Sequence, residues 1–427
     1  MVIDVEQAKR PIAPGSVEGT GLEFGVIADL TLKSLYFAGN ISGNEVADRL
    51  ALSVTVATEV LDFLRREHLC EVTGGTGRSQ GTLRYSLAGS GIERASRALE
   101  RSGYVGPAPV PLSDYMEQVR KQSIFNVEIS RQRIEESLSH LVLPERTTDL
   151  IGQAVSAKRA SLLYGASGNG KTSVAQGLRG ALPGHILIPY AIEVMREIIQ
   201  VYDPSTHEAV ETAAANGEEL SRPGMPDRRW VLIKRPAVIA GGELSAHHLD
   251  LMMDEVHKTY EAPIQMKANG GLLVIDDFGR QRLEAVYLLN RWVIPLEQRV
   301  DYLSLHSGAR FEVPFDAISL FVTNLMPEGL ADDAFLRRIR YKVEIPGPDA
   351  ASFIEILKRE CQRNDVAYDD AAASHFLNIY SHNGTREMRG CHPRDIVEAI
   401  VDAARYHGNG RALTPASIDA ACANYFV

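Results

Sequence analysis

Two short stretches, residues 165–172 and 272–279, contain the residue types that phosphate chemistry requires. The first reads GASGNGKT and fits the spacing G-x-x-x-x-G-K-[ST]. In this pattern the glycines let backbone N–H groups surround phosphate oxygens without Cβ clashes. Lys171 can reach the outer phosphates of a nucleotide, and the Thr172 hydroxyl can bind Mg²⁺. The residues expected to hold phosphate are Gly165, Ala166, Ser167, Gly168, Asn169, Gly170, Lys171 and Thr172.

The sequence around this loop favours a phosphate site over a glycine-rich turn that matches by chance. The apolar run SLLY precedes the loop and the helical pattern SVAQGLRGAL follows it. This is the strand–loop–helix context that the motif needs. The partial positive charge at the start of the following helix also favours a phosphate group.

The second stretch, LLVIDDFG, is an apolar run that ends in two aspartates. A buried strand here would place Asp276 at the carboxyl edge of the sheet, where ligands bind in open α/β sheets. We expect Asp276 to hold Mg²⁺, directly or through water, and Asp277 to orient or deprotonate an attacking water. The alternative is a pair of aspartates that only caps a turn at the end of the strand.

Composition limits the class of protein. The chain has 427 residues, enough for two or three domains of about 100–200 residues, and 45% of them are apolar, as in soluble globular proteins. It has no run of about 18 apolar residues, and its N-terminus lacks the apolar core of a signal peptide. The four cysteines lack metal-like spacing and are expected to be reduced thiols in the cytoplasm. The net charge of −10 argues against a protein that coats nucleic acid through bulk charge.

The chain divides into five expected segments. From about Leu150, short apolar runs alternate with helical stretches, which predicts a parallel sheet covered on both faces. The runs are SLLYG, HILIPYAI, LLVID, SLFVTN and YKVEI, and three prolines in GYVGPAPVPLS predict a stiff linker upstream of them. The segments are a flexible N-terminus (1–24), a small domain (25–103), a proline-rich linker with a connecting helix (104–140), an α/β core (141–348) and a helical domain (349–427).

Over roughly residues 140–427 the chain resembles an AAA+ ATPase. After the two stretches above, SLFVTN ends in Asn324, the place of the family's sensor 1 residue. DDAFLRRIRYKVEI is similar to the arginine-finger segment, with Arg337 and Arg338 as candidates, and CHPRDIVEAI is similar to the sensor 2 helix, with Arg394 as its arginine. The resemblance implies an α/β P-loop fold with a five-stranded parallel sheet, a helical lid, and hydrolysis of ATP with Mg²⁺.

The resemblance also implies a role for each of these side chains. Asn324 would bond the attacking water or the γ-phosphate. Arg337 or Arg338, reaching from one subunit into the next, would neutralise charge in the transition state. Arg394 would report the nucleotide state by moving the lid. A strand-end cap by Asn324, an ion pair of Arg394 with Asp395, and a plain surface ion pair for one of the two finger candidates stay open as alternatives.

Two further features, a hairpin and an aspartate, bear on the resemblance to AAA+ proteins. DYLSLHSG and ARFEVPF predict a hairpin before the sensor strand, which resembles the pre-sensor-1 hairpin of the MoxR-like and magnesium-chelatase-like branch. Such hairpins commonly project toward the ring pore or a partner, and a plain surface hairpin is the alternative. Many members have a glutamate where this chain has Asp277, which is one methylene shorter. This departure points to slow hydrolysis or to a switch.

The stretch 193–270 is longer than the family's minimal core. RRWVLIKRPAVIAGGEL predicts a strand pair and SAHHLDLMMDEVHKTY a helix. His247, His248 and His257 lack the spacing of a metal site, so we expect them to be exposed or packed. Tyr260 is the one aromatic that we consider for a pore loop.

Residues 25–103 resemble a winged-helix domain, with helical patterns, an N-cap at Ser53 and a hairpin around GGTGRSQG. Residues 1–114 contain 11 lysines and arginines against 14 aspartates and glutamates, a net charge of −3. The hairpin loop offers only Arg78, with Arg84 on the next strand. Because DNA binding needs a basic face, a protein client is favoured over DNA, and packing against the ring is a third option. A finger arginine needs a neighbouring subunit, so a homo-oligomer, with a hexamer as one option, is expected.

Overall fold

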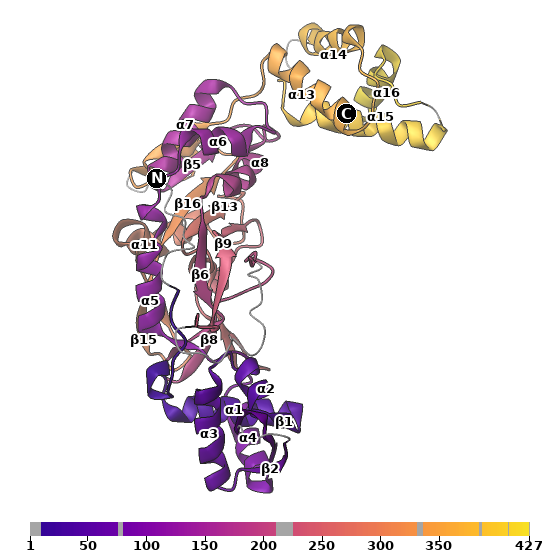
Figure 1. Cartoon of the computed structure of the whole chain (residues 1–427). Helices are drawn as coiled ribbons and strands as arrows, with labels where there is room; N and C mark the ends of the chain where they lie inside the picture. Colours follow the sequence, from indigo (N-terminus) through magenta and orange to yellow (C-terminus); the bar gives the residue numbers. More distant parts are fainter. Residues whose placement is uncertain are drawn as a thin grey trace.

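The computed structural model describes residues 10–75, 80–210, 225–330, 336–383, 387–408 and 410–426. Figure 1 shows an elongated molecule with the N-terminal helices at one end, the C-terminal helices at the other and an α/β core between them. Within these ranges, every helix is too short or too polar to span a lipid bilayer.

The core contains a five-stranded sheet in which all neighbouring strands are parallel. Continuous apolar runs form its central strands because both faces of a parallel sheet are covered. The α/β fold class with a five-stranded parallel sheet is therefore confirmed. The strand order is β10 (Ala237–Ala240), β13 (Gly271–Ile275), β16 (Ala317–Val322), β5 (Ser161–Tyr164) and β17 (Tyr341–Glu344).

Helices bury both faces of this sheet. Along β16 the side chains of Ile318, Leu320 and Val322 point to one hydrophobic cluster, and Ala317 and Phe321 point to the other. This alternation is the period of two expected of a strand. The first face is covered by α6 (Arg131–Leu138), α7 (Glu145–Ser156) and α8 (Lys171–Gly177), and the second by α10 (Ala285–Arg291) and α11 (Val293–Gln298).

One apolar run does not join the parallel sheet. HILIPYAI was expected to be a core strand, but β6 (His185–Pro189) pairs antiparallel with β9 (Trp230–Lys234), and AVIA forms the edge strand β10 instead. The strand β10 forms a parallel ladder with β13, and the buried Arg235 guanidinium just before β10 donates to the backbone oxygens of Pro183 and of Gly270, which precedes β13. These contacts hold β10 next to β13.

A second, mixed sheet lies beside the core. Its strands are, in order, β11 (Met252–Asp254), β12 (Thr259–Glu261), β8 (Glu197–Gln200), β7 (Ala191–Val194) and β4 (Val110–Pro111). It shares a hydrophobic cluster with the helix α5 (Leu112–Lys121) and with the hairpin β14 (Val300–Ser304)–β15 (Arg310–Pro314). The expected hairpin is present, and one of its faces is buried: Leu303 and Val313 are fully buried, whereas Tyr302 on the other face is exposed. The short helix α9 (Ile264–Lys267) precedes β13.

The helix expected in SAHHLDLMMDEVHKTY is wrong beyond its first turn. A 3-10 turn, η7 (Ala246–Leu249), is followed by the β11–β12 hairpin. The Asp254 carboxylate accepts the backbone N–H groups of Val256 and His257, which closes the turn of this hairpin. Tyr260 is buried in β12 and its hydroxyl accepts the backbone N–H of His306, so it is not available as a pore-loop aromatic.

The N-terminal part consists of four helices and a three-stranded antiparallel sheet of order β1–β3–β2. Ser42 and Glu45 form a capping box at the start of α2, and Ser53 caps α3. Arg78 lies outside the described residues. The elements are α1 (Phe24–Ala38), β1 (Ile41–Ser42), α2 (Gly43–Arg49), α3 (Val54–Arg66), β2 (Cys70–Gly74), β3 (Arg84–Leu87) and α4 (Gly89–Arg101).

The segment before α1 differs from the flexible N-terminus expected over residues 1–24. Residues 1–9 lie outside the described part, but Val17, Thr20 and Leu22 are buried, with Val17 and Leu22 in the same cluster as α1 and α3. The proline-rich linker is packed as well, since Tyr104 and Val110 are buried.

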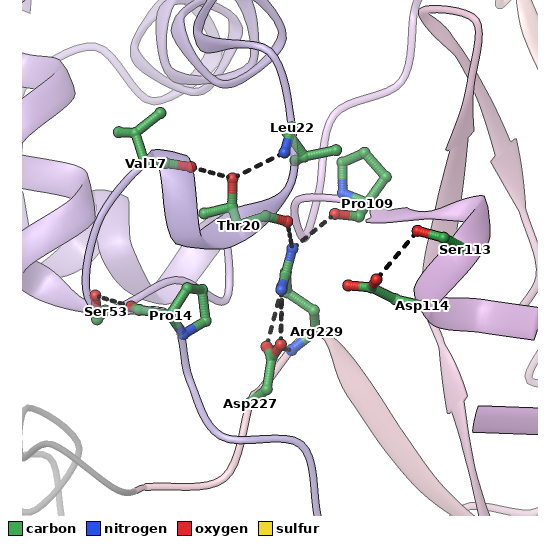
Figure 2. Close-up of polar contacts among 10 residues, drawn as sticks. All are labelled: Pro14, Val17, Thr20, Leu22, Ser53, Pro109, Ser113, Asp114, Asp227 and Arg229. Carbon is green, nitrogen blue, oxygen red and sulfur yellow. Dashed lines mark hydrogen bonds and ion pairs between the residues drawn. The ribbon is translucent and has the colours of Figure 1, made fainter. Parts of the chain in front are cut away.

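A buried arginine joins these segments (Figure 2). The Arg229 guanidinium forms an ion pair with Asp227 at 2.8 Å and donates to the backbone oxygens of Thr20 (3.1 Å) and Pro109 (3.2 Å). Both side chains of the ion pair are almost fully buried. Removing one partner of such a pair costs about 3–5 kcal/mol because it leaves an uncompensated buried charge. The N-terminal part is therefore fixed to the core rather than loosely tethered.

Four helices form the C-terminal part around a separate hydrophobic cluster that includes Phe353, Phe376 and Ile396. They are α13 (Ala350–Arg363), α14 (Asp370–Asn383), α15 (Cys391–His407) and α16 (Pro415–Tyr425).

Candidate functional site

The glycine-rich loop connects β5 to α8 at the carboxyl edge of the parallel sheet. Gly165, Gly168 and Gly170 all have positive φ angles, between 83° and 135°, which residues with a Cβ rarely adopt. At Gly168 space is also limiting, because a Cβ would lie 2.5 Å from the Cys391 sulfur. The backbone curve thus favours glycine at all three positions, and the close approach of α15 further requires it at Gly168.

Lys171 is the first residue of α8, and its side chain is turned into this loop. Its Nζ donates to the backbone oxygens of Gly165 (2.9 Å) and Ala166 (2.8 Å). Burial lowers the pKa of Lys171, and the negative charges of Asp276 and Asp277 oppose that shift. The ammonium group thus lies between the loop and the two carboxylates, where a phosphate group could replace the loop oxygens as its partner.

The ends of two adjacent strands carry the polar residues opposite the loop. Asp276 follows β13, and its carboxylate accepts the backbone N–H of Asp277 at 2.9 Å. Asp277 has a φ angle of 49°, a left-handed conformation that costs about 1–2 kcal/mol in a residue with a Cβ. Asn324, which lies two residues past the end of β16, donates from its amide Nδ2 to the Asp277 carboxylate at 3.4 Å. Asp277 and Asn324 are therefore brought together, as a water-positioning pair would require.

The C-terminal helices contact the glycine-rich loop directly. The backbone N–H of Cys391, at the start of α15, donates to the Gly168 oxygen at 2.8 Å. The Asn169 side chain links both sides, since its Nδ2 donates to the Ile345 oxygen and its Oδ1 accepts the Gly390 N–H, each at 3.4 Å. A movement of the loop would therefore change its contacts with the start of α15.

Arg394 lies one turn into α15 and faces the same cavity. Its guanidinium pairs with Asp395 at 2.7 Å, which is the ion pair that was left open as an alternative. The other carboxylate oxygen of Asp395 accepts the Tyr425 hydroxyl at 2.6 Å. The side chain of Arg394 is 52% exposed, so the pairing is compatible with a change of partner.

A single cavity of about 900 Å³ connects these groups. Among the expected site residues, those that line it are Ser167, Gly168, Asn169, Gly170, Lys171, Thr172, Asp276, Asp277, Asn324 and Arg394.

A further wall of this cavity has no recognisable motif in the sequence. His140, Leu141, Val142 and Leu143 from the segment before α7 line it, and so does Ile356 from α13. The side chains of Leu141, Val142, Leu143 and Ile356 offer an apolar surface beside the glycine-rich loop, as a nucleotide base would need. The apolar run LVLP ahead of a helix was visible in the sequence, but only the fold places it next to the loop.

Arg337 and Arg338 do not reach this cavity. They lie just before β17, at the opposite edge of the sheet, where they line a second cavity. Arg338 pairs with Glu297 at 2.6 Å, and Arg337 is exposed. Neither residue can act on the site of its own subunit in this arrangement.

No group of three or more His, Cys, Asp and Glu residues that could hold a metal ion is found within the described residues. His248 bonds to Ser245, and His257 pairs with Asp254. Thr172 and Asp276 line the cavity together, and Mg²⁺ in nucleotide sites takes only one or two protein oxygens, with phosphate and water completing its shell. This donor pair fits Mg²⁺ that arrives with a nucleotide.

A protein-family model described as a domain of unknown function, DUF8689, matches residues 349–424. These residues correspond to the C-terminal helices. None of the curated proteins is similar to the chain in sequence.

Solved structures of low identity are similar to parts of the chain. NtrX from Brucella abortus, in complexes with ATP and with ADP, is 16% and 13% identical over 77% of this chain, with TM-scores of 0.36 and 0.40. This chain spans 62% and 65% of those NtrX chains. RuvB from Thermotoga maritima, a Holliday junction branch migration motor, is 13% identical over 66% of this chain and 69% of its own, with a TM-score of 0.37.

Proposed function

We propose that this chain is an AAA+ ATPase that binds ATP with Mg²⁺ in the 900 Å³ cavity and hydrolyses it. One observation carries the proposal: Lys171 and Thr172 at the start of α8 line the same cavity as Asp276, Asp277 and Asn324, which follow the ends of β13 and β16. A motif that matched by chance would have no reason to meet two carboxylates and an amide across a cavity of nucleotide size.

The proposed roles follow from position. The loop backbone and Lys171 bind the phosphates, and Thr172 and Asp276 hold Mg²⁺, which supplies charge neutralisation at the phosphates when it is bound. Asp277 acts as base or orients the water, with its carboxylate held by Asn324 at 3.4 Å. Arg394 exchanges Asp395 for a phosphate oxygen when nucleotide is present, which moves α15.

Oligomer formation is part of the proposal. Arg337 and Arg338 lie at the edge of the sheet opposite the nucleotide cavity, so a finger role requires the cavity of a second copy. Arg337 is the better candidate because Arg338 is held by Glu297. A homo-oligomeric ring, with a hexamer as one option, would bring these two edges together.

A protein client is favoured over DNA for the N-terminal, winged-helix-like part. In helix-turn-helix proteins the N-terminal residues of the recognition helix contact base edges. Here the segment before α1 lies against the corresponding end of α3, because Ser53 donates to the Pro14 oxygen and Glu59 accepts the Val17 N–H (Figure 2 shows the first contact). A DNA-acting ATPase would need this segment to move away, so DNA stays the second candidate.

The test is the ATPase rate as a function of protein concentration, with and without duplex DNA at physiological salt. Specific activity that rises with concentration supports sites shared between subunits. DNA stimulation at that salt would replace the protein client by DNA. Absence of both turnover and ATP binding would overturn the nucleotide site itself.

A further inference from the structure

The second cavity that contains Arg337 and Arg338 has a volume of about 290 Å³ and lies at the amino edge of the parallel sheet. Its walls are the residues before β5, the end of α11, the start of β16 and the residues before β17. The nucleotide cavity is lined by the other ends of β5 and β16. The two cavities are thus separated by the length of the strands.

The charges around this second cavity are almost all positive. Its cationic lining residues are Lys158, Arg159, Arg299, Arg337, Arg338 and Arg340. Among the described residues that line it, the one carboxylate is that of Glu297, which already pairs with Arg338. Within the described ranges, the guanidinium groups of Arg159, Arg337 and Arg340 form no hydrogen bond or ion pair.

The positive charges of this cavity lie close enough to affect the pKa of a neighbouring arginine, Arg299. Arg299 lies over the Phe125 ring at 3.4 Å and donates to the Lys158 oxygen. Burial, and then the charge of Arg159, lower the pKa of Arg299 to about 10, and Asp316 opposes this. Repulsion between these cations would be relieved by an anion in the cavity.

A buried hydroxyl group is also part of this cavity. Ser319 lies within β16, is 2% exposed and contributes to the cavity lining. Its Oγ has no hydrogen-bond partner among the described residues. A buried donor without a partner is rare in a folded protein and is explained when a bound ion or ligand supplies one.

We propose that this basic cavity is a second binding site, for a small phosphate-bearing anion, formed by Ser319 within β16 and by Arg159 and Arg340 at its rim. The planar guanidinium groups suit the geometry of phosphate oxygens, and the Ser319 hydroxyl donates to one of them. The volume of about 290 Å³ is at the lower end of ligand sites, which suits an anion of the size of pyrophosphate and not a macromolecule.

The site is independent of the proposed hydrolysis and needs no second copy of the chain. A finger residue would act on a phosphate held in a neighbour's nucleotide cavity, whereas this anion is held within one chain by residues from four segments. Arg159, Arg340 and Ser319 have no part in the proposed hydrolysis, so they can be changed without touching it.

The experiment is calorimetric titration with inorganic pyrophosphate at about 0.15 M salt, with Arg159→Ala, Arg340→Ala and Ser319→Ala, each in the unchanged chain and with Lys171→Ala. We expect each substitution to weaken binding about tenfold or more, with or without Lys171. Ser319→Ala is expected to keep or raise the thermal stability, since it removes a buried hydroxyl without a partner. Arg405→Glu on the exposed side of α15 is the control for net charge and is expected to leave this affinity unchanged.

Two results would overturn the proposal. One is the absence of pyrophosphate binding up to about 1 mM once Lys171 is removed. The other is binding that remains there but does not respond to Arg159, Arg340 or Ser319. A signal that follows Lys171 alone belongs to the glycine-rich loop, so failure of this site and failure of the nucleotide site give different patterns.

Discussion

The two edges of the parallel sheet carry opposite arrangements of charge. At the carboxyl edge, Lys171 faces Asp276 and Asp277, and Arg394 is paired with Asp395. At the amino edge, within the described residues, the one carboxylate that lines the cavity with Arg159, Arg337 and Arg340 is Glu297, which is paired with Arg338. A site that must hold both phosphate and Mg²⁺ needs both signs of charge, whereas a site for an anion alone, or for a neighbour's phosphate, needs only the positive sign.

The largest expected effect is at the carboxyl edge. Lys171→Ala removes the ammonium group that lies between the loop and the two carboxylates, and should abolish ATP binding and all turnover. Binding of a fluorescent ATP analogue measures this, and Lys121→Ala on the exposed side of α5 controls for loss of charge. If Lys171→Ala keeps an ATP affinity within about tenfold of that of the unchanged chain, Lys171 does not hold the phosphates, and the proposed phosphate site at the carboxyl edge is wrong.

The next prediction tests whether the arginines at the amino edge of one copy act on the nucleotide cavity at the carboxyl edge of a second copy. Arg337→Ala should lower turnover by about 10³–10⁵ at protein concentrations where the oligomer forms, because a finger arginine stabilises charge in the transition state. Arg338→Ala should have a smaller effect, since Arg338 is paired with Glu297. Steady-state ATPase rates, combined with sedimentation to show the same oligomer, provide the measurement.

Glu297→Gln is the matched control, because it releases Arg338 without removing an arginine. If neither Arg337→Ala nor Arg338→Ala changes the rate, the finger assignment is wrong and the amino edge has no part in hydrolysis.

A smaller effect is expected within the carboxyl edge itself. Asp277→Asn keeps the shape of the side chain but removes its basicity, so ATP binding should persist while turnover falls by about 10²–10⁴. Single-turnover assays with excess protein separate the two quantities. Asp277→Glu adds the methylene that many AAA+ members have, and a faster rate would mean that the short side chain limits hydrolysis. Retained turnover in Asp277→Asn would place the base elsewhere.

The carboxyl edge was more predictable from the sequence than the amino edge for a physical reason. GASGNGKT and LLVIDDFG are local patterns, and parallel strands bring their ends to one edge, so their meeting follows from the fold class. The basic cavity is built from short runs of residues in four segments, and only the arginines before β17 form a local pattern in the sequence. Strand order was also only partly predictable: HILIPYAI is as apolar as a core strand, but its first half pairs antiparallel with β9, and AVIA takes the edge position. Likewise, Ile12 to Leu22 looked polar and flexible, although Val17 and Leu22 pack against α1 and α3.

The smallest expected effect concerns the charge balance of Arg394. Asp395→Asn removes the carboxylate that holds this guanidinium, so Arg394 becomes available to the nucleotide. The Arg394 side chain is 52% exposed, so the pair is worth about 1 kcal/mol at most and ATP affinity should rise about two- to fivefold. Competition titration with ATP and ADP is the measurement, and Asp402→Asn, further along α15, is the control.

Whether ATP affinity rises or falls in Asp395→Asn shows whether Asp395 competes with phosphate for Arg394 or orients Arg394 toward the cavity. Tyr425→Phe, which removes the hydroxyl that holds Asp395, should act in the same direction and more weakly. If Asp395→Asn lowers ATP affinity instead, Asp395 orients Arg394 toward the cavity and does not compete with phosphate for it. The ion pair would then be part of the nucleotide site, and the carboxyl edge would already hold its arginine in place before nucleotide binds.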